Sequence, residues 1–343
     1  MFPKKSLFIF LVSIIAVLFI GWLDTTHNLD RAIASSPQSD TLSLDIPIDC
    51  DLGQDCFIMH YVDLDPSEAE VDFNCGRQTY DGHKGTDFGI SDLQVMAEGV
   101  PVIAAAPGTV LRTRDGIEDK LIEDRTQQQA VTETETECGN GVVIGHGDGW
   151  ETQYCHLRKD SVVVQPNTEV REGDVLGMVG ASGLASFPHV HLSVRHNGEV
   201  IDPFVGISET QGCNQKLAPL WSQSLDYTPT GLIDAGFSTS PPTQTQLWKG
   251  LGKNEPLIAD TPALIFWVHS YGVKESDLEK WQLIAPDGTV AIEEENTVER
   301  PFRSWLGYVG KRNIISGLWQ GKYQLWRDGS LIFEVSREAV VEG

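Results

Sequence analysis

The chain has 343 residues, of which 41% are hydrophobic and 22% are charged, so it is long enough for two globular domains and a tail. Its formal net charge is −24, from 49 acidic and 25 basic residues. A surface of this sign repels the phosphates of nucleic acids and of anionic lipids, so we expect no nucleic-acid partner.

The N-terminus carries a targeting signal. Lys4 and Lys5 precede an apolar run from Leu7 to Leu23, and positive charge in this place favours a cytoplasmic N-terminus with an exported remainder. A small-residue cleavage site is present at Ala32-Ile33-Ala34. We therefore assign residues 1–34 to a cleaved signal peptide or to a retained membrane anchor. Either would place the rest of the chain in the periplasm or cell envelope, and an anchor would tie it to the inner membrane.

The cysteine content agrees with export. An even number of cysteines in an oxidising compartment predicts disulfides. None of the cysteines has the CxxC spacing of a zinc ribbon. The six are Cys50, Cys56, Cys75, Cys138, Cys155 and Cys213.

After the apolar run, residues 35–49 are predicted to be a tether and residues 50–213 the first domain, with its core at 76–204. Short apolar runs broken by glycines, such as 141–144 and 190–194, predict strands. One stretch, Leu93 to Glu98, weakly favours a helix. The polar residues 115–137 interrupt this pattern and predict a long exposed loop.

A second domain follows. Residues 214–246 include a Pro/Ser/Thr-rich stretch and predict a linker or irregular connection. Residues 247–343 hold regularly spaced apolar runs, and Asp287-Gly288 and Asp328-Gly329 lie between strand-like flanks, as in hairpins. This pattern predicts a small antiparallel β-sandwich. It contains no cluster of histidine, cysteine and carboxylate.

The first candidate metal ligands are His83 and Asp87, four residues apart. In an extended segment, residues i and i+4 lie on the same face. Gly82, Gly85 and Gly89 make a helix improbable here. Both side chains can therefore reach one ion, although this pattern alone is weak evidence.

The second histidine group lies in Pro188-His189-Val190-His191-Leu192. Polar and apolar residues alternate here with the period of a strand. His189 and His191 therefore share one face, while the apolar residues face a core. Two imidazoles on one strand face are a common metal-binding arrangement.

The third group is Tyr154-Cys155-His156, at the end of a hairpin formed by residues 141–145 and 150–156. Centring this hairpin on its turn places Cys138 nearly opposite Cys155. We predict a disulfide between them, and closing this loop would stabilise the fold by about 3 kcal/mol. Cys155 would then point away from the face that carries His156. The pairing of the other four cysteines stays open.

Together these groups supply two histidines and a carboxylate for a metal, and two further imidazoles. Spacing alone leaves open which of His189 and His191 is the ligand. Catalytic zinc sites combine three protein ligands with a water, whose pKa the metal lowers. A neighbouring imidazole can accept or donate the proton during amide hydrolysis. The sequence therefore predicts a zinc-dependent hydrolase.

Four blocks of sequence carry a resemblance to a known family. They are GHKGTDFGI, AAAPGTV, GNGVVIGHGDGWETQYCHL and GDVLGMVGASGLASFPHVHLSV. In order and spacing they resemble the lysostaphin/LytM family of zinc endopeptidases, over about residues 76–204. The chain differs from the common family pattern in its long 115–137 segment and in Phe187, where small or polar residues are frequent.

The resemblance implies a role for each site residue. His83, Asp87 and His191 would hold one zinc ion per chain, and His156 and His189 would be the catalytic histidines beside the water and the scissile carbonyl. Inactive members of the family have replaced ligands, whereas all five positions here carry the active residue types. The resemblance thus implies a zinc metalloendopeptidase that acts on peptidoglycan cross-links.

The expected fold is mainly β, with an antiparallel β-sheet metallopeptidase domain that has an open groove, followed by a small β-sandwich. The sandwich loosely resembles an immunoglobulin-like module and offers a candidate surface for an envelope protein partner. The alternative function is a non-hydrolytic module that binds the cell wall or activates another hydrolase through the same groove. The complete set of site residues favours the enzyme.

Overall fold

The computed structural model describes residues 42–208, 212–213, 215–251 and 256–343. The predicted signal peptide or anchor, residues 1–34, lies outside these ranges. Among the helices that the described ranges contain, none is long and apolar enough to cross a membrane.

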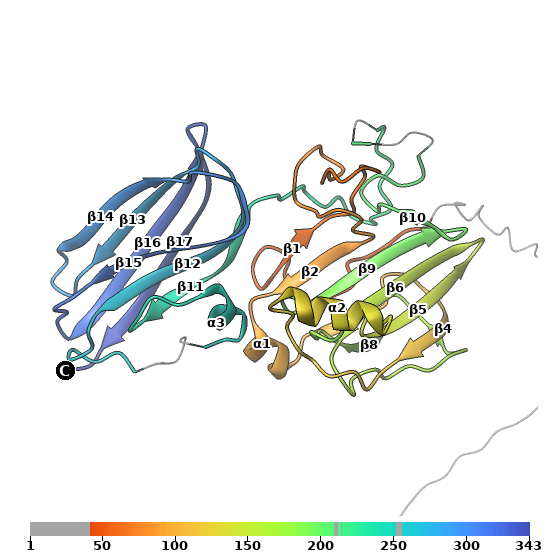
Figure 1. Ribbon diagram of the computed structural model, residues 1–343, viewed down its shortest axis with the longest axis horizontal. Helices are drawn as coiled ribbons and strands as arrows, with labels where there is room; N and C mark the ends of the chain where they lie inside the picture. Colours follow the sequence, from red (N-terminus) through yellow and green to blue (C-terminus); the bar gives the residue numbers. More distant parts are fainter. Residues whose placement is uncertain (1–41, 209–211, 214, 252–255) are drawn as a thin grey trace, which may run out of the picture. The chain divides into compact units, whose positions relative to one another are not determined.

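The first module is built on an eight-stranded antiparallel sheet, coloured from orange to green in Figure 1. Its strand order is β1-β2-β9-β6-β5-β4-β7, with β10 paired to β9, and a separate two-stranded ladder joins β3 to β8. The strands are β1 Cys56–His60, β2 Thr86–Ile90, β3 Pro101–Ile103, β4 Gly108–Arg114, β5 Asn140–Gly147, β6 Trp150–Leu157, β7 Glu169–Val170, β8 Val175–Met178, β9 His189–His196 and β10 Glu199–Ile201. The mainly β, antiparallel prediction is confirmed.

Strand β9 shows why the sheet places its histidines together. Val190, Leu192 and Val194 alternate along it and are at most 1% exposed in the core of the module. His189 and His191 occupy the intervening positions, as the period-two pattern predicts. The apolar face therefore fixes the direction of both imidazoles.

Three short helices accompany the described strands. They are α1 Leu93–Glu98, α2 Arg125–Glu133 and α3 Gln244–Trp248. Helix α1 confirms the weak helical prediction, whereas α2 lies in the segment predicted as a loop, so that prediction was wrong there. The Asp124 carboxylate accepts a hydrogen bond from the backbone N–H of Gln127 at 2.9 Å and caps α2. None of the residues of α2 is buried, so the segment has no apolar periodicity from which the helix could be predicted.

The second module is a β-sandwich of two antiparallel sheets, β11-β12-β15 and β14-β13-β16-β17. Its core includes Trp281, Trp319 and Tyr323, each at most 2% exposed. The two predicted hairpins are confirmed, because β13 pairs with β14 and β16 with β17 across the two Asp-Gly turns. The strands are β11 Gly231–Ser238, β12 Leu264–Val273, β13 Leu278–Ile284, β14 Val290–Thr297, β15 Phe302–Lys311, β16 Gly317–Arg327 and β17 Ser330–Val341.

The sandwich begins earlier than the sequence suggested. Strand β11 lies inside the range 214–246 that was predicted as a linker, and it pairs along β12 from Gly231 to Ser238. A Cβ at Gly236 would come within 2.7 Å of the Trp267 ring, so this glycine makes room for a neighbouring side chain. Glycine inside a strand often marks such a close approach.

The described part of the predicted tether also differs from expectation. Leu44 and Ile48 are fully buried in the core of the first module. Isolated bridges join Leu44 to Trp221 and Ile48 to Val102. Residues 44–48 are therefore part of the module, because their apolar side chains cover core surface that water would otherwise reach.

A continuous apolar core joins the two modules. Ile233, Trp248 and Tyr271 belong to the same buried cluster as the first module's strands. The rings of Phe57 on β1 and Tyr271 on β12 stack with their centroids 5.3 Å apart. Aromatic contacts of this kind add to the burial of apolar area, so the sandwich packs directly against the strand that leads into the site described below.

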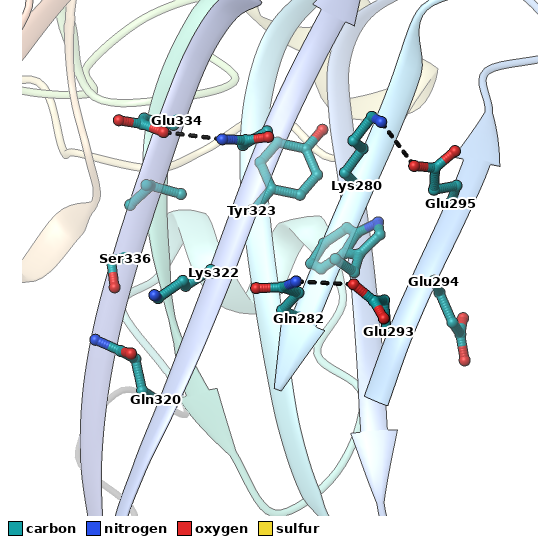
Figure 2. Close-up of a pocket in the computed structure, with 13 residues that line it drawn as sticks. Lys280, Gln282, Glu293, Glu294, Glu295, Gln320, Lys322, Tyr323, Glu334 and Ser336 are labelled. Atoms are coloured by element: carbon teal, nitrogen blue, oxygen red, sulfur yellow. Dashed lines mark hydrogen bonds and ion pairs between the residues drawn. The ribbon is translucent and has the colours of Figure 1, made fainter. Parts of the chain in front are cut away.

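The outer face of the sheet β14-β13-β16-β17 is polar, as Figure 2 shows. Its side chains pair across neighbouring strands: Lys280 with Glu295 at 2.7 Å, Gln282 with Glu293 at 2.9 Å and Gln324 with Glu334 at 3.0 Å. These pairs follow the strand register. They are the usual cross-strand partners of a solvated face.

Disulfides connect all six cysteines. The predicted Cys138–Cys155 bond is present, with the two Cα atoms 4.8 Å apart. The pairing left open by the sequence is Cys50–Cys56 and Cys75–Cys213. The bond between Cys75 and Cys213 encloses the longest loop, since its cysteines are 138 residues apart.

Candidate metal centre and active site

Three of the predicted residues form a compact cluster of potential metal ligands. The Nε2 atom of His83 lies 3.1 Å from the Asp87 Oδ1 atom, and the Nδ1 atom of His191 lies 2.8 Å from the same oxygen. The two imidazole nitrogens are 3.1 Å apart. Asp87 and His191 are direct partners across the ladder between β2 and β9, so the sheet register itself brings these ligands together.

The hydrogen bonds behind the two imidazoles determine which nitrogen faces the cluster. His83 donates its Nδ1–H to the carbonyl oxygen of Tyr61 at 2.7 Å. The hydroxyl of Ser193 donates to the carbonyl of Lys84, so its oxygen is left to accept a hydrogen bond from His191 Nε2–H at 3.1 Å. His83 Nε2 and His191 Nδ1 then carry lone pairs that converge with the Asp87 carboxylate. These three atoms form a group that could hold a metal ion, and two histidines with one carboxylate suit zinc.

Close backbone packing protects this arrangement. A Cβ at Gly85 would lie 2.5 Å from the Nε2 atom of His191. Any larger residue there would push the His191 ring away from the cluster. The glycine between His83 and Asp87 is thus required by the approach of the two strands.

A fourth residue, His60, holds the other oxygen of the carboxylate. Its Nδ1 atom lies 3.0 Å from Asp87 Oδ2, and its side chain is nearly buried. His60 ends β1, where a bulge shifts the pairing with β2 so that His60 lies opposite Asp87. This residue was not predicted from the sequence, because it belongs to no local motif and only the β1–β2 register reveals it.

The two remaining imidazoles lie beside the cluster. The ring centroids of His156 and His189 are 4.6 Å apart, and His189 Nε2 is 3.7 Å from Asp87 Oδ1. Each donates its Nδ1–H to a backbone carbonyl at 2.8 Å, His156 to Ser182 and His189 to Phe187. Both rings are thereby held with Nε2 unprotonated and available.

The conformation of His156 is unusual. Its φ angle is +63°, in the left-handed region that residues other than glycine rarely adopt. Such backbone costs on the order of 1–3 kcal/mol and persists where the surrounding structure enforces it. Here the disulfide to the preceding Cys155 and the hydrogen bond to Ser182 enforce it, and the ring is turned towards His189.

The pKa of Asp87 in the cluster is shifted for other reasons than the pKa values of His156 and His189 beside it. Burial would raise the pKa of Asp87, but its electrostatic interactions with His83 and His189 and the hydrogen bonds from His191 and His60 hold it well below its usual range. Burial lowers the pKa of His189 to about 4 and that of His156 well below its usual value. The site therefore combines an ionised carboxylate with neutral imidazoles at neutral pH.

A groove with a volume of about 620 Å³ opens beside these residues. Its floor contains Asp87 and His189, and one wall comes from the segment around α2, which the sequence analysis treated as a loop. The second module contributes another part of the lining. These second-module residues are Gln244, Trp248, Arg303 and Ser304.

Phe187 has a defined role in this groove. Its ring stacks on His189 with the centroids 4.2 Å apart, and the Trp248 ring packs against Phe187 with the centroids 5.3 Å apart. The departure from the family pattern at this position therefore supports a site imidazole. It also links that imidazole to the second module.

The structure brings together all five residues predicted from the sequence. His83, Asp87 and His191 form the cluster that can hold a metal ion. His156 and His189 lie beside it and outside the group of three. The geometry distinguishes His191 from His189 by its contact with His83, which spacing alone could not do. The catalytic and metal-binding roles themselves stay predictions.

The chain matches the model of Peptidase family M23 over residues 81–203. Among curated relatives, DD-carboxypeptidase/endopeptidase Mpg of Neisseria meningitidis serogroup B is 43% identical over 65 residues, which are 19% of this chain and 14% of that protein. Peptidoglycan DD-endopeptidase ShyA of Vibrio cholerae is 29% identical over 120 residues, which are 35% of this chain and 22% of that protein. The chain thus covers less than a quarter of the length of either relative.

Similar solved structures include the catalytic domain of the antimicrobial peptidase lysostaphin from Staphylococcus simulans. The identity is 19% and the TM-score 0.27, with 42% of this chain and 85% of that chain covered. A zinc-containing peptidase from Vibrio cholerae has 21% identity and a TM-score of 0.30, with 47% of this chain and 37% of that chain covered.

Proposed function

Residues 81–203 match the model of Peptidase family M23, and from this match we propose that the chain is an exported zinc metalloendopeptidase that hydrolyses peptide bonds in peptidoglycan cross-links. The observation that carries the proposal is the convergence of three potential metal-ligand atoms, from His83, Asp87 and His191, beside the imidazoles of His156 and His189. That combination provides a metal site and proton-transfer groups in one groove.

The donor set fits zinc. His83 Nε2, Asp87 Oδ1 and His191 Nδ1 would be its three protein ligands, which leaves a coordination position for water or substrate. When bound, zinc lowers the pKa of water and polarises a carbonyl group. His60 and Ser193 would orient Asp87 and His191 from behind through the hydrogen bonds described above.

His156 and His189 would move the protons of the reaction. Each donates Nδ1–H to a fixed backbone carbonyl, so its Nε2 can accept a proton from an attacking water. The resulting imidazolium can return that proton to the leaving amine or donate a hydrogen bond to the developing oxyanion. Their low pKa values keep both rings in the accepting form at neutral pH.

The proposed substrate rests on the relatives. Peptidoglycan DD-endopeptidase is the printed name of the Vibrio cholerae protein, and DD-carboxypeptidase/endopeptidase that of the Neisseria protein. A cross-link between wall peptides is therefore the proposed target. Export would bring the chain to that substrate, and three disulfides suit an oxidising compartment.

The test is digestion of purified, cross-linked peptidoglycan by the zinc-loaded full chain, with fragments identified by mass spectrometry. We expect cross-linked dimers to be converted to monomers and metal analysis to give about one zinc per chain. His191→Ala should lose both the zinc and the conversion. If the wild-type chain binds zinc and peptidoglycan but releases no fragment, the alternative of a non-hydrolytic wall-binding or hydrolase-activating module is correct.

A further inference from the structure

The second module borders the groove beside the metal cluster. Gln244 and Trp248 of α3 line the groove together with Arg303 and Ser304 of β15. These side chains lie outside residues 81–203, the segment that the family model matches. The groove therefore has a boundary that the family match does not describe. A substrate peptide that extends from the metal cluster towards α3 would meet this boundary.

Contacts with two separate segments of the first module hold this boundary in place. Lys249, the residue after α3, pairs with Glu123 just before α2 at 2.5 Å. Arg303 pairs with Glu70, in the segment that leads to Tyr80. Glu123 and Tyr80 themselves line the groove. Partly exposed ion pairs contribute little stability, so the apolar core that the two modules share provides most of the attachment.

The distance from the site to this boundary is short. The ring centroids of His189 and Phe187 are 4.2 Å apart, and those of Phe187 and Trp248 are 5.3 Å apart. The Trp248 centroid therefore lies within about 9.5 Å of the His189 centroid, the sum of the two distances. An extended peptide advances about 3.3 Å per residue, so about two or three residues fit between the two rings. Phe187 and Trp248 are at most 8% exposed, and neither can move without repacking the core.

We propose that the second module limits the substrate arm on its side of the scissile bond to about two or three residues. The proposal rests on the proposed endopeptidase function and adds to it a preference for cross-linked peptides with one short arm. The groove volume of about 620 Å³ agrees with this limit, because pockets of that size enclose a small ligand. A longer arm would have to bend out of the groove at Trp248, and this bend would displace the scissile carbonyl from the metal cluster.

The test uses two series of synthetic cross-linked peptide dimers. In one series neutral residues lengthen the arm on the carbonyl side of the scissile bond, and in the other they lengthen the arm on the amine side. With the zinc-loaded full chain, we expect kcat/KM to fall by about 10–100-fold beyond about three residues in one series, because a misplaced scissile bond reacts slowly. The other series should show no such step.

Variants of Gln244 should move the step. Its amide donates to Ser304 Oγ at 3.2 Å, which holds the side chain at the boundary. Gln244→Trp fills space there and should move the step to arms about one residue shorter, whereas Gln244→Ala should move it to longer arms. Thr245→Trp places the same ring at an exposed position of α3 that is not part of the groove lining, and it should behave as wild type.

The rate on the shortest dimer reports whether each variant is folded. The two Gln244 variants shift the step in opposite directions, so the proposal can still be refuted if one of them does not fold. A step that is absent from both series would overturn the limit. So would a step that the Gln244 variants leave in place, or one that Thr245→Trp moves equally.

Binding separates this proposal from the proposed function. Calorimetric titration of both series into zinc-loaded His156→Ala, with and without Gln244→Ala, measures the length limit without turnover. If the wild-type chain hydrolyses no dimer, the endopeptidase function fails. A loss of affinity of about tenfold or more beyond about three residues in one series, which Gln244→Ala moves to longer arms, still supports the limit. Affinity that is absent or independent of arm length would overturn it. If the wild-type chain hydrolyses both series at rates independent of arm length, the function stands and the limit is wrong.

Discussion

Two buried carboxylates, one in each module, accept hydrogen bonds from their neighbours and behave in opposite ways. Asp87 in the first module is 2% exposed and Glu279 in the sandwich 4%. Imidazoles surround Asp87 and hold its pKa well below the usual range. Glu279 accepts from Trp305 Nε1 at 2.9 Å and Tyr323 OH at 3.0 Å, and burial raises its pKa.

The difference teaches that burial alone does not identify a functional carboxylate. Both groups are removed from water, but only Asp87 has neighbours that can carry positive charge or share a cation. The donors around Glu279 are neutral, so they can orient it and cannot compensate a full charge. The first arrangement suits an ion, whereas the second suits a fixed internal contact of the sandwich.

The largest expected effect comes from variants that distinguish the imidazoles that bind the metal from those that transfer protons. His156→Ala and His189→Ala should each lower kcat by about 10²–10⁴-fold, because each removes a general acid or base. Both variants should still bind about one zinc per chain. Steady-state kinetics on a cross-linked peptide and metal analysis of the same preparations check the two parts separately.

A histidine outside the groove provides the control. His146 on β5 contacts the carbonyl of Pro107 and the hydroxyl of Thr152, so His146→Ala should leave kcat close to wild type. Loss of zinc in His189→Ala together with its retention in His191→Ala would show that these two roles are exchanged. Full activity in both His156→Ala and His189→Ala would place the chemistry elsewhere.

A smaller effect is expected from His60, which reaches Asp87 from behind. His60→Phe removes the donor to Asp87 Oδ2 and should weaken zinc binding by about 10–100-fold, the range typical of losing a hydrogen bond to a metal ligand. His60→Asn places an amide N–H near the former Nδ1 position and should recover most of the affinity. Competition with a chelator measures both. Equal affinities in the two variants would mean that the hydrogen bond contributes nothing to the site.

The sequence predicted the structure correctly where a local pattern determines which way each side chain points. Alternation in β9 separated His189 and His191 from the core-facing valines, and the hairpin between β5 and β6 located the Cys138–Cys155 disulfide. It could not reveal His60, whose position depends on a bulge and on pairing with a strand 26 residues later in the chain. Contacts set by register between distant strands leave no local signal.

The same limit explains the errors in domain boundaries. The Pro/Ser/Thr-rich residues after β11 predicted an irregular connection, whereas Gly231 and Gly236 of β11 pack closely against Tyr271 and Trp267 of β12. The part of the groove lined by Arg303 and Trp248 could not be predicted from the sequence either, because it depends on how the sandwich packs against β1. The sequence and its family resemblance predicted the residues of the candidate metal site but not the second-module residues that line the groove beside it.

The smallest expected effect concerns Glu279, and it tests the other half of the comparison. A carboxyl group whose pKa is higher in the folded than in the unfolded chain stabilises the fold fully below its unfolded pKa of about 4.3, and this stabilisation is lost as pH rises through the folded pKa. Wild type should therefore lose stability over that range.

Glu279→Gln removes the charge and keeps an oxygen that can accept from Trp305 and Tyr323. The variant should match wild type near pH 4 and become the more stable of the two as pH rises, by a few degrees in Tm if the gain is about 1 kcal/mol. Scanning calorimetry of the full chain at several pH values measures this, with Glu334→Gln on the exposed outer face as the control. A constant difference across pH would show that Glu279 is ionised in the fold, and the contrast with Asp87 would then lie in their ligands and not in their charge.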